Sequence, residues 1–252
     1  MAPHARIAAA LCAALAAARA GQDPLPATVP QPRADAWGAA RHAEVLALAR
    51  TCDPRTIVFI GDSITQGWEQ EGRDVWAERI APIGAVNLGV SGDRTEHVLW
   101  RLREAPIGRL EPKLVVIMIG TNNVGHGRDG AAGTLAGVRA VVECLRSQVP
   151  GAAVILCAIL PRGEQMNPMR GELLQVNQAL SRAYPDEGPS ACVRFVDCGD
   201  RFIAPDGSIP ASLMPDGLHL SAAGYAAWAD ALKPLFAERQ AVPSRTPPTT
   251  VP

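Results

Sequence analysis

Apolar runs without polar alternation recur between helical patterns along the middle of the chain. Such runs are typical of strands buried on both faces, and the helices between them supply the crossovers of a parallel sheet. The predicted strands are 56–60, 85–88, 113–119, 153–159 and 193–196. The predicted helices are 36–50, 75–80, 94–104, 132–148, 169–183 and 222–237. The pattern therefore predicts an α/β fold, a three-layer α/β/α sandwich with a central, mostly parallel five-stranded sheet.

The N-terminus lies outside this pattern. Arg6 precedes an alanine-rich apolar run over 7–18, and Ala18-Arg19-Ala20 has the small-x-small form of a cleavage site. These features predict a signal peptide over 1–20 and a secreted or periplasmic protein, against the alternative of an alanine-rich disordered leader. The run is too short to span a bilayer, so we expect no membrane insertion after signal removal.

Length and composition limit the class of protein. The chain has 252 residues, enough for one domain with a full-sized core, which we place at 36–238. Proline and polar residues over 21–35 predict a linker, and those over 239–252 predict a disordered tail. The formal net charge of −1 gives no electrostatic reason to expect a nucleic-acid partner.

The cysteine pattern indicates neither a disulfide framework nor a metal site. Of six cysteines, Cys12 belongs to the predicted leader, which leaves an odd number. No C-x-x-C pair occurs, so neither a zinc site nor a thioredoxin-like motif is predicted. Cys192 and Cys198 flank a predicted strand, and whether they pair stays open.

Polar motifs follow the predicted strands. Gly61-Asp62-Ser63-Ile64 follows the first strand, Ser91-Gly92-Asp93 the second and Gly120-Thr121-Asn122-Asn123 the third. Asp216-Gly217-Leu218-His219 lies shortly before the last helix. Since functional residues of such sheets gather at the carboxyl ends of the strands, we expect these motifs to meet.

Together they supply the groups that ester hydrolysis by a serine needs. Ser63 is the predicted nucleophile, His219 its general base, and Asp216 the carboxylate that orients the imidazole. The predicted oxyanion hole consists of the backbone N–H groups of Ser63 and Gly92 and the side-chain amide of Asn122.

The residues after Gly92 predict a helix start. Asp93-Arg94-Thr95-Glu96 resembles a capping box, with Asp93 as N-cap and Glu96 as its reciprocal partner. Gly92 would then precede a helix N-terminus, where free N–H groups favour an anion.

Each motif also has a structural interpretation. Gly-Asp-Ser is an ordinary turn sequence, Gly92 can be a turn glycine, and Asn122 can satisfy loop backbone. Asp216 and His219 can be an unrelated helix cap and a surface histidine. They can also be a metal pair, but only His126 is a nearby further ligand, so we predict no metal and no cofactor. The coincidence of four motifs at strand ends favours the catalytic site.

The four motifs resemble the blocks of the SGNH, or GDSL-type, hydrolase superfamily, with Ile64 in place of the usual leucine. The resemblance implies a flavodoxin-like fold and a serine esterase. Its name-giving residues match Ser63, Gly92, Asn122 and His219, and Asp216 completes the triad. The segments 87–102, 160–163 and 218–221 are further similar to the catalytic subunits of intracellular platelet-activating-factor acetylhydrolases.

That branch implies a short acyl pocket. Its acyl-site residues match Ile64, Thr121 and Leu218, which would leave little room beyond acetyl. We therefore expect a secreted esterase that hydrolyses short-chain esters, with acetyl as the expected acyl group. The expected substrate is a small molecule or a glycan, and the leaving group is a carbohydrate or another polar alcohol. A lipase, phospholipid deacetylase or thioesterase with the same triad is the alternative, and a non-catalytic binding domain is a minor one. The resembling enzymes form dimers, so a homodimer stays open.

Overall fold

The computed structural model describes residues 25–186 and 191–241. The predicted signal peptide, 1–20, lies outside these residues, as does most of the predicted tail. Within them, no helix is long and apolar enough to cross a membrane. The five cysteines that the structure describes are all free, including Cys192 and Cys198.

Five strands form one sheet in which every pair is parallel. The strands are β1 (Ile57–Gly61), β2 (Ala85–Gly89), β3 (Leu114–Met118), β4 (Ala153–Cys157) and β5 (Val193–Val196). Their order is β2-β1-β3-β4-β5, the order of flavodoxin-like sheets. The predicted fold class is confirmed, and each strand lies within two residues of its predicted bounds.

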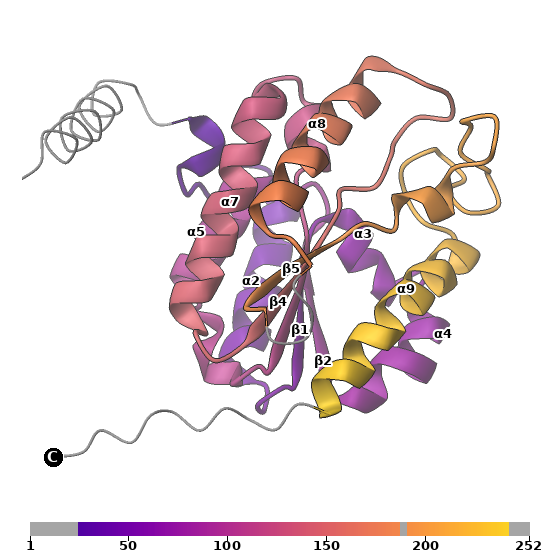
Figure 1. Cartoon of the computed structure of the whole chain (residues 1–252). Helices are drawn as coiled ribbons and strands as arrows, with labels where there is room; N and C mark the ends of the chain where they lie inside the picture. Colours follow the sequence, from indigo (N-terminus) through magenta and orange to yellow (C-terminus); the bar gives the residue numbers. More distant parts are fainter. Residues whose placement is uncertain (1–24, 187–190, 242–252) are drawn as a thin grey trace, which may run out of the picture.

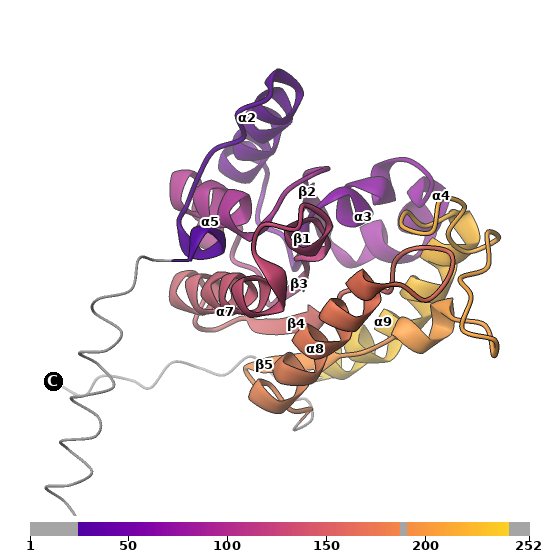
Figure 2. The ribbon, with the colours of Figure 1, turned by 90° about the horizontal axis from the view of Figure 1, so that it is seen from above.

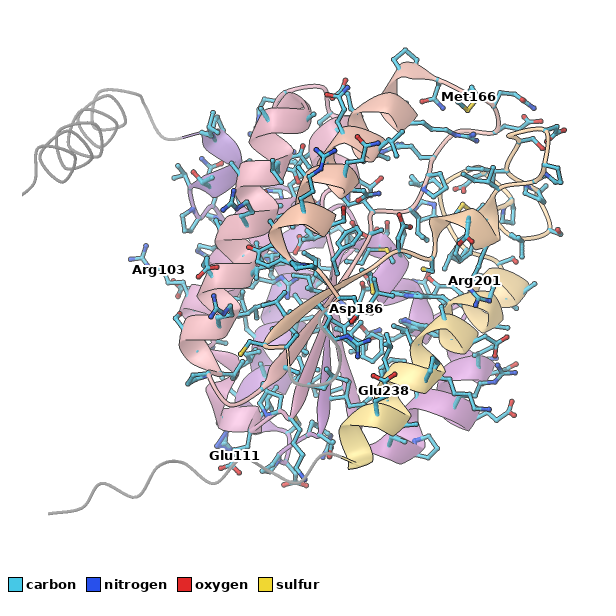
Figure 3. The ribbon with its side chains drawn as sticks, in the orientation of Figure 1. Arg103, Glu111, Met166, Asp186, Arg201 and Glu238 are labelled. Carbon is cyan, nitrogen blue, oxygen red and sulfur yellow. The ribbon has the colours of Figure 1, made fainter. Side chains whose placement is uncertain are left out.

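Helices cover both faces of this sheet (Figures 1 and 2). One face carries α2 (Ala36–Thr51), α5 (Thr95–Glu104), α7 (Gly130–Gln148) and α8 (Pro168–Ala183). The other carries α9 (Ala222–Ala241), α4 (Arg73–Val75) and the following π-helical turn Trp76–Ile80. Alternate residues of β1 serve the two cores: Val58 and Ile60 face the first, Ile57 and Phe59 the second. Charged side chains such as Arg103, Glu111 and Arg201 lie on the outer surface (Figure 3).

Short helices that the sequence pattern did not predict follow two of the strands. α3 (Ser63–Gln66) comes directly after β1, and α6 (Thr121–Gly125) comes after β3. Helices of one turn give no periodic signal, which explains why the pattern missed them. The remaining short helical turns are Pro26–Thr28, Gly67–Glu69, Ala81–Ile83, Ile107–Leu110 and Gly199–Phe202.

The described part of the expected linker packs against the domain. Ala27 is fully buried, and its carbonyl accepts a hydrogen bond from Thr95 Oγ1 at 2.8 Å. The N–H of Gln31 donates to the carbonyl of Glu96 at 3.1 Å. This segment, 25–35, therefore belongs to the folded unit and not to a free linker; we refer to it as the N-terminal strap.

Candidate active site

The junction of β1 and α3 fixes Ser63 at the carboxyl edge of the sheet. β1 ends at Gly61 because the chain turns back tightly there: a Cβ at this position would collide with Thr65 Oγ1 and the Met118 carbonyl. Asp62 is the N-cap of α3, and its carboxylate accepts a hydrogen bond from the N–H of Ile64 at 3.0 Å. Ser63 is thus the first residue of α3, half-buried and held from both sides.

The structure brings Ser63, His219 and Asp216 together in one hydrogen-bonded chain. His219 Nε2 lies 3.0 Å from Ser63 Oγ, and His219 Nδ1 lies 2.6 Å from Asp216 Oδ2. Because a carboxylate only accepts, Nδ1 carries the proton in this contact and Nε2 presents its lone pair to the serine hydroxyl. Asp216 Oδ1 also accepts from the N–H groups of Leu218 at 2.9 Å and His219 at 2.7 Å.

These contacts keep Asp216 ionised in an open site. Partial burial raises the pKa of Asp216, but the hydrogen bonds from the backbone and ring of His219 and from Leu218 N–H outweigh it and lower the pKa below its ordinary value. The side chains of His219 and Asp216 are 48% and 55% exposed. The imidazole is therefore reachable from solvent.

Three further N–H donors lie on the segments that follow β1, β2 and β3, adjacent strands in the sheet. They are the backbone N–H groups of Ser63 and Gly92 and the amide of Asn122. In the part of the chain that the structure describes, neither backbone N–H donates to another protein group. Asn122 Nδ2 donates one hydrogen bond to the Asp93 carbonyl at 2.9 Å, which leaves its second hydrogen for a ligand.

The predicted capping box after Gly92 is wrong. α5 begins at Thr95 with Arg94 as its N-cap, and the N–H of Arg94 donates to His97 Nδ1 at 3.0 Å. Glu96 pairs instead with the guanidinium of Arg94, at 2.6 Å, and that of Arg128, at 2.5 Å.

Asp93 is a buried member of an ion network and not a helix cap. Its carboxylate, fully buried, lies 2.8 Å from Arg101 Nε and 2.9 Å from His42 Nε2. Burial raises the pKa of Asp93, but Arg101 and His42 lower it by more than burial raises it. The pKa of Asp93 is therefore below its ordinary value. The remaining Arg101 donors bind the carbonyls of Leu88 at 2.9 Å and Gly61 at 3.3 Å, so one guanidinium joins the ends of β1 and β2.

Two charged groups beside the triad were missed by sequence reasoning. Asp62 is fully buried, and this burial raises its pKa to about 7. Arg162 Nη1 donates to the carbonyl of Thr121 at 2.8 Å. Burial lowers the pKa of Arg162, and the nearby carboxyl groups of Asp62 and Asp216 oppose this fall. Arg162 lies in a segment that sequence similarity had singled out, but no residue pattern indicated its position.

The expected acyl-pocket residues directly follow or precede the site residues along the chain. Ile64 and Thr121 are each 1% exposed, and Leu218 is half-buried. Their role in acyl binding stays a prediction.

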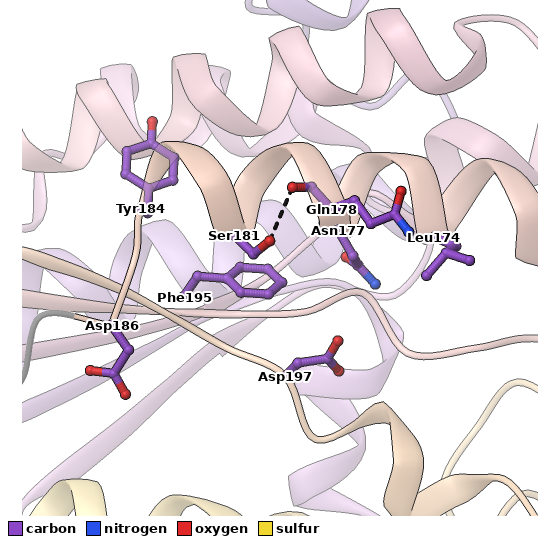
Figure 4. A pocket seen from close by; sticks show the side chains of 8 residues that line it. All are labelled: Leu174, Asn177, Gln178, Ser181, Tyr184, Asp186, Phe195 and Asp197. Atoms are coloured by element: carbon purple, nitrogen blue, oxygen red, sulfur yellow. Dashed lines mark hydrogen bonds between the residues drawn. The ribbon is translucent and has the colours of Figure 1, made fainter.

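A separate cavity of about 320 Å³ lies between α8 and the outer strand β5 (Figure 4). Its lining includes Leu174, Tyr184 and Phe195 and none of the triad residues. Among the described residues, no three His, Cys, Asp or Glu side chains are grouped so as to hold a metal ion.

Comparison with known proteins identifies relatives of this chain. The chain is 39% identical to platelet-activating factor acetylhydrolase IB subunit alpha1 of Homo sapiens over 204 residues, 79% of this chain and 84% of the relative. It is 35% identical to subunit alpha2 of Rattus norvegicus over 208 residues, 81% and 87% of the two chains.

Solved structures share the fold. A GDSL-like lipase from Bacteroides thetaiotaomicron aligns with a TM-score of 0.62 and 23% identity over 81% of this chain and 98% of its own. An acetylxylan esterase from Geobacillus stearothermophilus aligns with a TM-score of 0.55 and 23% identity over 73% and 94%. Residues 59–227 match the GDSL-like Lipase/Acylhydrolase family. The chain therefore belongs to this family and is a GDSL-type, acetylhydrolase-like acylhydrolase.

Proposed function

We propose that this acylhydrolase removes acetyl and other short acyl groups from esters of a carbohydrate or another polar alcohol. The observation that carries the proposal is the hydrogen-bonded chain from Ser63 Oγ through His219 to Asp216, open to solvent at the carboxyl edge of the sheet. A nucleophile, a base and a carboxylate in this order are the machinery of acyl transfer to water.

The proposed reaction uses each group in turn. His219 Nε2 takes the proton of Ser63 Oγ as the oxygen attacks the ester carbonyl, and Asp216 stabilises the resulting imidazolium. The N–H groups of Ser63 and Gly92 and the amide of Asn122 donate to the developing oxyanion. The imidazolium then gives its proton to the leaving alcohol. Water activated by His219 releases the acid and restores Ser63.

The preference for acetyl is supported by the burial of Ile64 and Thr121, which are adjacent in the chain to Ser63 and Asn122. Fixed, buried side chains leave an acyl chain little space to displace them. The matched relatives are named acetylhydrolases. The preference for a polar alcohol is supported by the exposure of His219 and Asp216, since the leaving group departs on the side where these side chains meet solvent.

A second candidate is the removal of acetyl from a phospholipid. The names of the matched relatives favour it, since both are platelet-activating factor acetylhydrolases.

Two assays test the proposal. The first compares p-nitrophenyl acetate, butanoate and octanoate, with Ser63→Ala as the control for the nucleophile. We expect kcat/KM to fall from acetate to octanoate and the alanine variant to be inactive. Equal or faster turnover of octanoate contradicts the acyl preference, and an active Ser63→Ala contradicts the nucleophile.

The second assay measures acetate release from acetylated xylan, acetylated monosaccharides and a phospholipid with an acetyl group. Faster release from the saccharides supports the polar-alcohol proposal. Faster release from the phospholipid replaces it with the second candidate.

We also propose that residues 1–20 direct export, on the sequence pattern given above. N-terminal sequencing of the protein secreted by an expressing bacterium should show a start at or near Gly21. Full-length protein retained in the cell would contradict export.

A further inference from the structure

The Ser91–Gly92 peptide group carries one of the proposed oxyanion donors at one end and a half-buried contact with an arginine at the other. Arg33 Nη1 donates to the carbonyl oxygen of Ser91 at 2.7 Å. That carbonyl and the Gly92 N–H belong to the same peptide unit. Because the unit is planar and trans, its oxygen and its hydrogen point in opposite directions. A bond that fixes the oxygen therefore fixes the direction of the N–H.

Arg33 also lies directly against Gly92. A Cβ added to Gly92 would come within 2.9 Å of Arg33 Nη1 and 3.1 Å of Nη2, so the guanidinium packs on the glycine backbone. Gly92 has φ +77°, a conformation that other residues rarely adopt, and it has no side chain to hold the turn. The Arg33 side chain is only 14% exposed and reaches within 3.5 Å of Asp93 Oδ1.

The arginine is itself held in place from α2. Asp35 Oδ2 lies 2.8 Å from Arg33 Nε and 2.7 Å from Nη2. The other oxygen of the same carboxylate accepts from the N–H of Gly38 at 2.7 Å, so Asp35 is the N-cap of α2. Helix α2, Asp35, Arg33 and the Ser91–Gly92 peptide thus form one connected series of contacts.

We propose that Arg33 of the N-terminal strap is a positioning residue for the oxyanion hole. It touches no reacting atom. It anchors the Ser91–Gly92 peptide from behind, and its charge polarises the peptide so that the Gly92 N–H becomes a stronger donor. The inference rests on the proposed oxyanion hole. It extends the catalytic unit beyond residues 59–227, the part that matches the family.

Three substitutions of Arg33 separate its charge from its hydrogen bond. Arg33→Lys keeps a charge and a donor, Arg33→Gln keeps only a neutral donor, and Arg33→Met keeps neither. With p-nitrophenyl acetate, kcat per active site should fall in the order Lys, Gln, Met. Loss of the charge and the hydrogen bond that anchor and polarise the Gly92 peptide predicts a fall of about 10- to 100-fold for Met, with KM nearly unchanged. Active sites are counted by titration with a fluorophosphonate, so that misfolded protein does not enter kcat.

The inhibition constant of phenylboronic acid is a second measurement, and it should not change if Arg33 has only a structural role. The adduct of phenylboronic acid with a serine is a negatively charged, tetrahedral boronate with a boron-bound oxygen where the oxyanion forms, so the inhibition constant should rise by the same factors as kcat falls. Arg41→Met is the matched control. Arg41 lies on α2, pairs with Glu69 at 2.7 Å and reaches the Gly89 carbonyl only at 3.4 Å, and it does not contact the Gly92 peptide. We expect kcat of this variant to stay within about twofold of wild type.

An unchanged kcat and boronate affinity in Arg33→Met overturns the inference, and so does a change in KM alone. If Arg33→Met does not fold, the order of Lys over Gln remains the test, and equal values for both overturn it. Activity in Ser63→Ala would refute the proposed function instead. An inactive Ser63→Ala beside a fully active Arg33→Met refutes only the role of Arg33.

Discussion

Neighbouring residues at this site have opposite environments. Ser63 is half-buried at the open edge of the sheet, whereas the Asp62 carboxylate is buried beneath it. Burial raises the pKa of Asp62 to about 7, while its hydrogen bond from Ile64 N–H opposes the rise. An ionised Asp62 is therefore a destabilised group in the folded protein at neutral pH.

Asp62 makes stability fall with rising pH. Between its ordinary value of 3.8 and about 7, the folded carboxyl holds a proton that the unfolded chain has released. The free energy of unfolding then decreases through this window by up to roughly 1.4 kcal/mol per pH unit. Asp62→Asn keeps the acceptor for Ile64 N–H and cannot ionise. Urea unfolding should show the variant gaining stability over wild type from pH 4.5 to pH 7.5, and a constant difference would contradict the raised pKa.

Two adjacent asparagines should separate activity from stability. Asn122→Ala removes a proposed oxyanion donor, and we expect kcat to fall by about 10²- to 10³-fold with little change in Tm. Asn123 is fully buried, and its side chain accepts from Thr95 N–H at 3.1 Å and donates to Asp129 at 3.1 Å. Asn123→Ala leaves the buried Thr95 N–H without its acceptor and removes one donor from Asp129, which keeps Arg128; it should cost about 1–3 kcal/mol of unfolding free energy. Kinetics and thermal melts of both variants check the contrast; the reverse pattern would exchange the two roles.

At the scale of elements, the sequence pattern predicted the long strands and helices, whose apolar residues recur regularly. It missed the short helices, which are fixed by contacts with the rest of the fold. Strands such as Leu114–Met118 and helices such as Gly130–Gln148 are long enough for burial on both faces or on one stripe to show in the sequence. The one-turn helices after β1 and β3 are fixed by the strand ends and leave no such signal. The start of α5 was misplaced because the Asp93 carboxylate binds Arg101, eight residues later in the chain, and Arg94 is the N-cap in its place.

Arg101 should therefore be a large contributor to the packing of β1 and β2. Arg101→Met removes one of the partners of the buried Asp93 carboxylate, which keeps His42, and also the donors to the Leu88 and Gly61 carbonyls. We expect a loss of about 3–5 kcal/mol, the range for breaking a buried ion pair. Arg103→Met, on the exposed side of the same helix, is the control and should change stability by less than about 0.5 kcal/mol. Equal effects in urea unfolding would argue against the buried network.

At the scale of the whole molecule, the folded unit begins before the predicted domain boundary. Strap residues such as Pro26 and Pro32 give the segment the composition of a linker, and composition does not show that Ala27 is buried. The meeting of Ser63, Asp216 and His219 was predictable, because each motif follows a strand or precedes the last helix in a familiar topology. The contact of Arg33 with the Gly92 peptide was not predictable, since no periodicity or spacing in the sequence connects the two residues.

The strap should contribute measurably to stability. A chain that begins at Asp35 keeps the N-cap of α2 but loses the buried Ala27 and the hydrogen bonds to Thr95 and Glu96 that a chain beginning at Leu25 retains. We expect the shorter chain to lose about 1–3 kcal/mol. Denaturant titration of the two chains measures the difference. Equal midpoints and slopes would show that the strap contacts add nothing to the fold.

The exposure of His219 and Asp216 has a consequence for the second half of the catalytic cycle. With about half of each side chain in contact with solvent, bulk water can approach the imidazole of the proposed acyl-enzyme directly, and the acid that the proposed reaction releases can leave in the same way. A dissolved alcohol has the same access as water, so the proposed acyl-enzyme should also transfer its acetyl group to added methanol in proportion to the concentration of that acceptor.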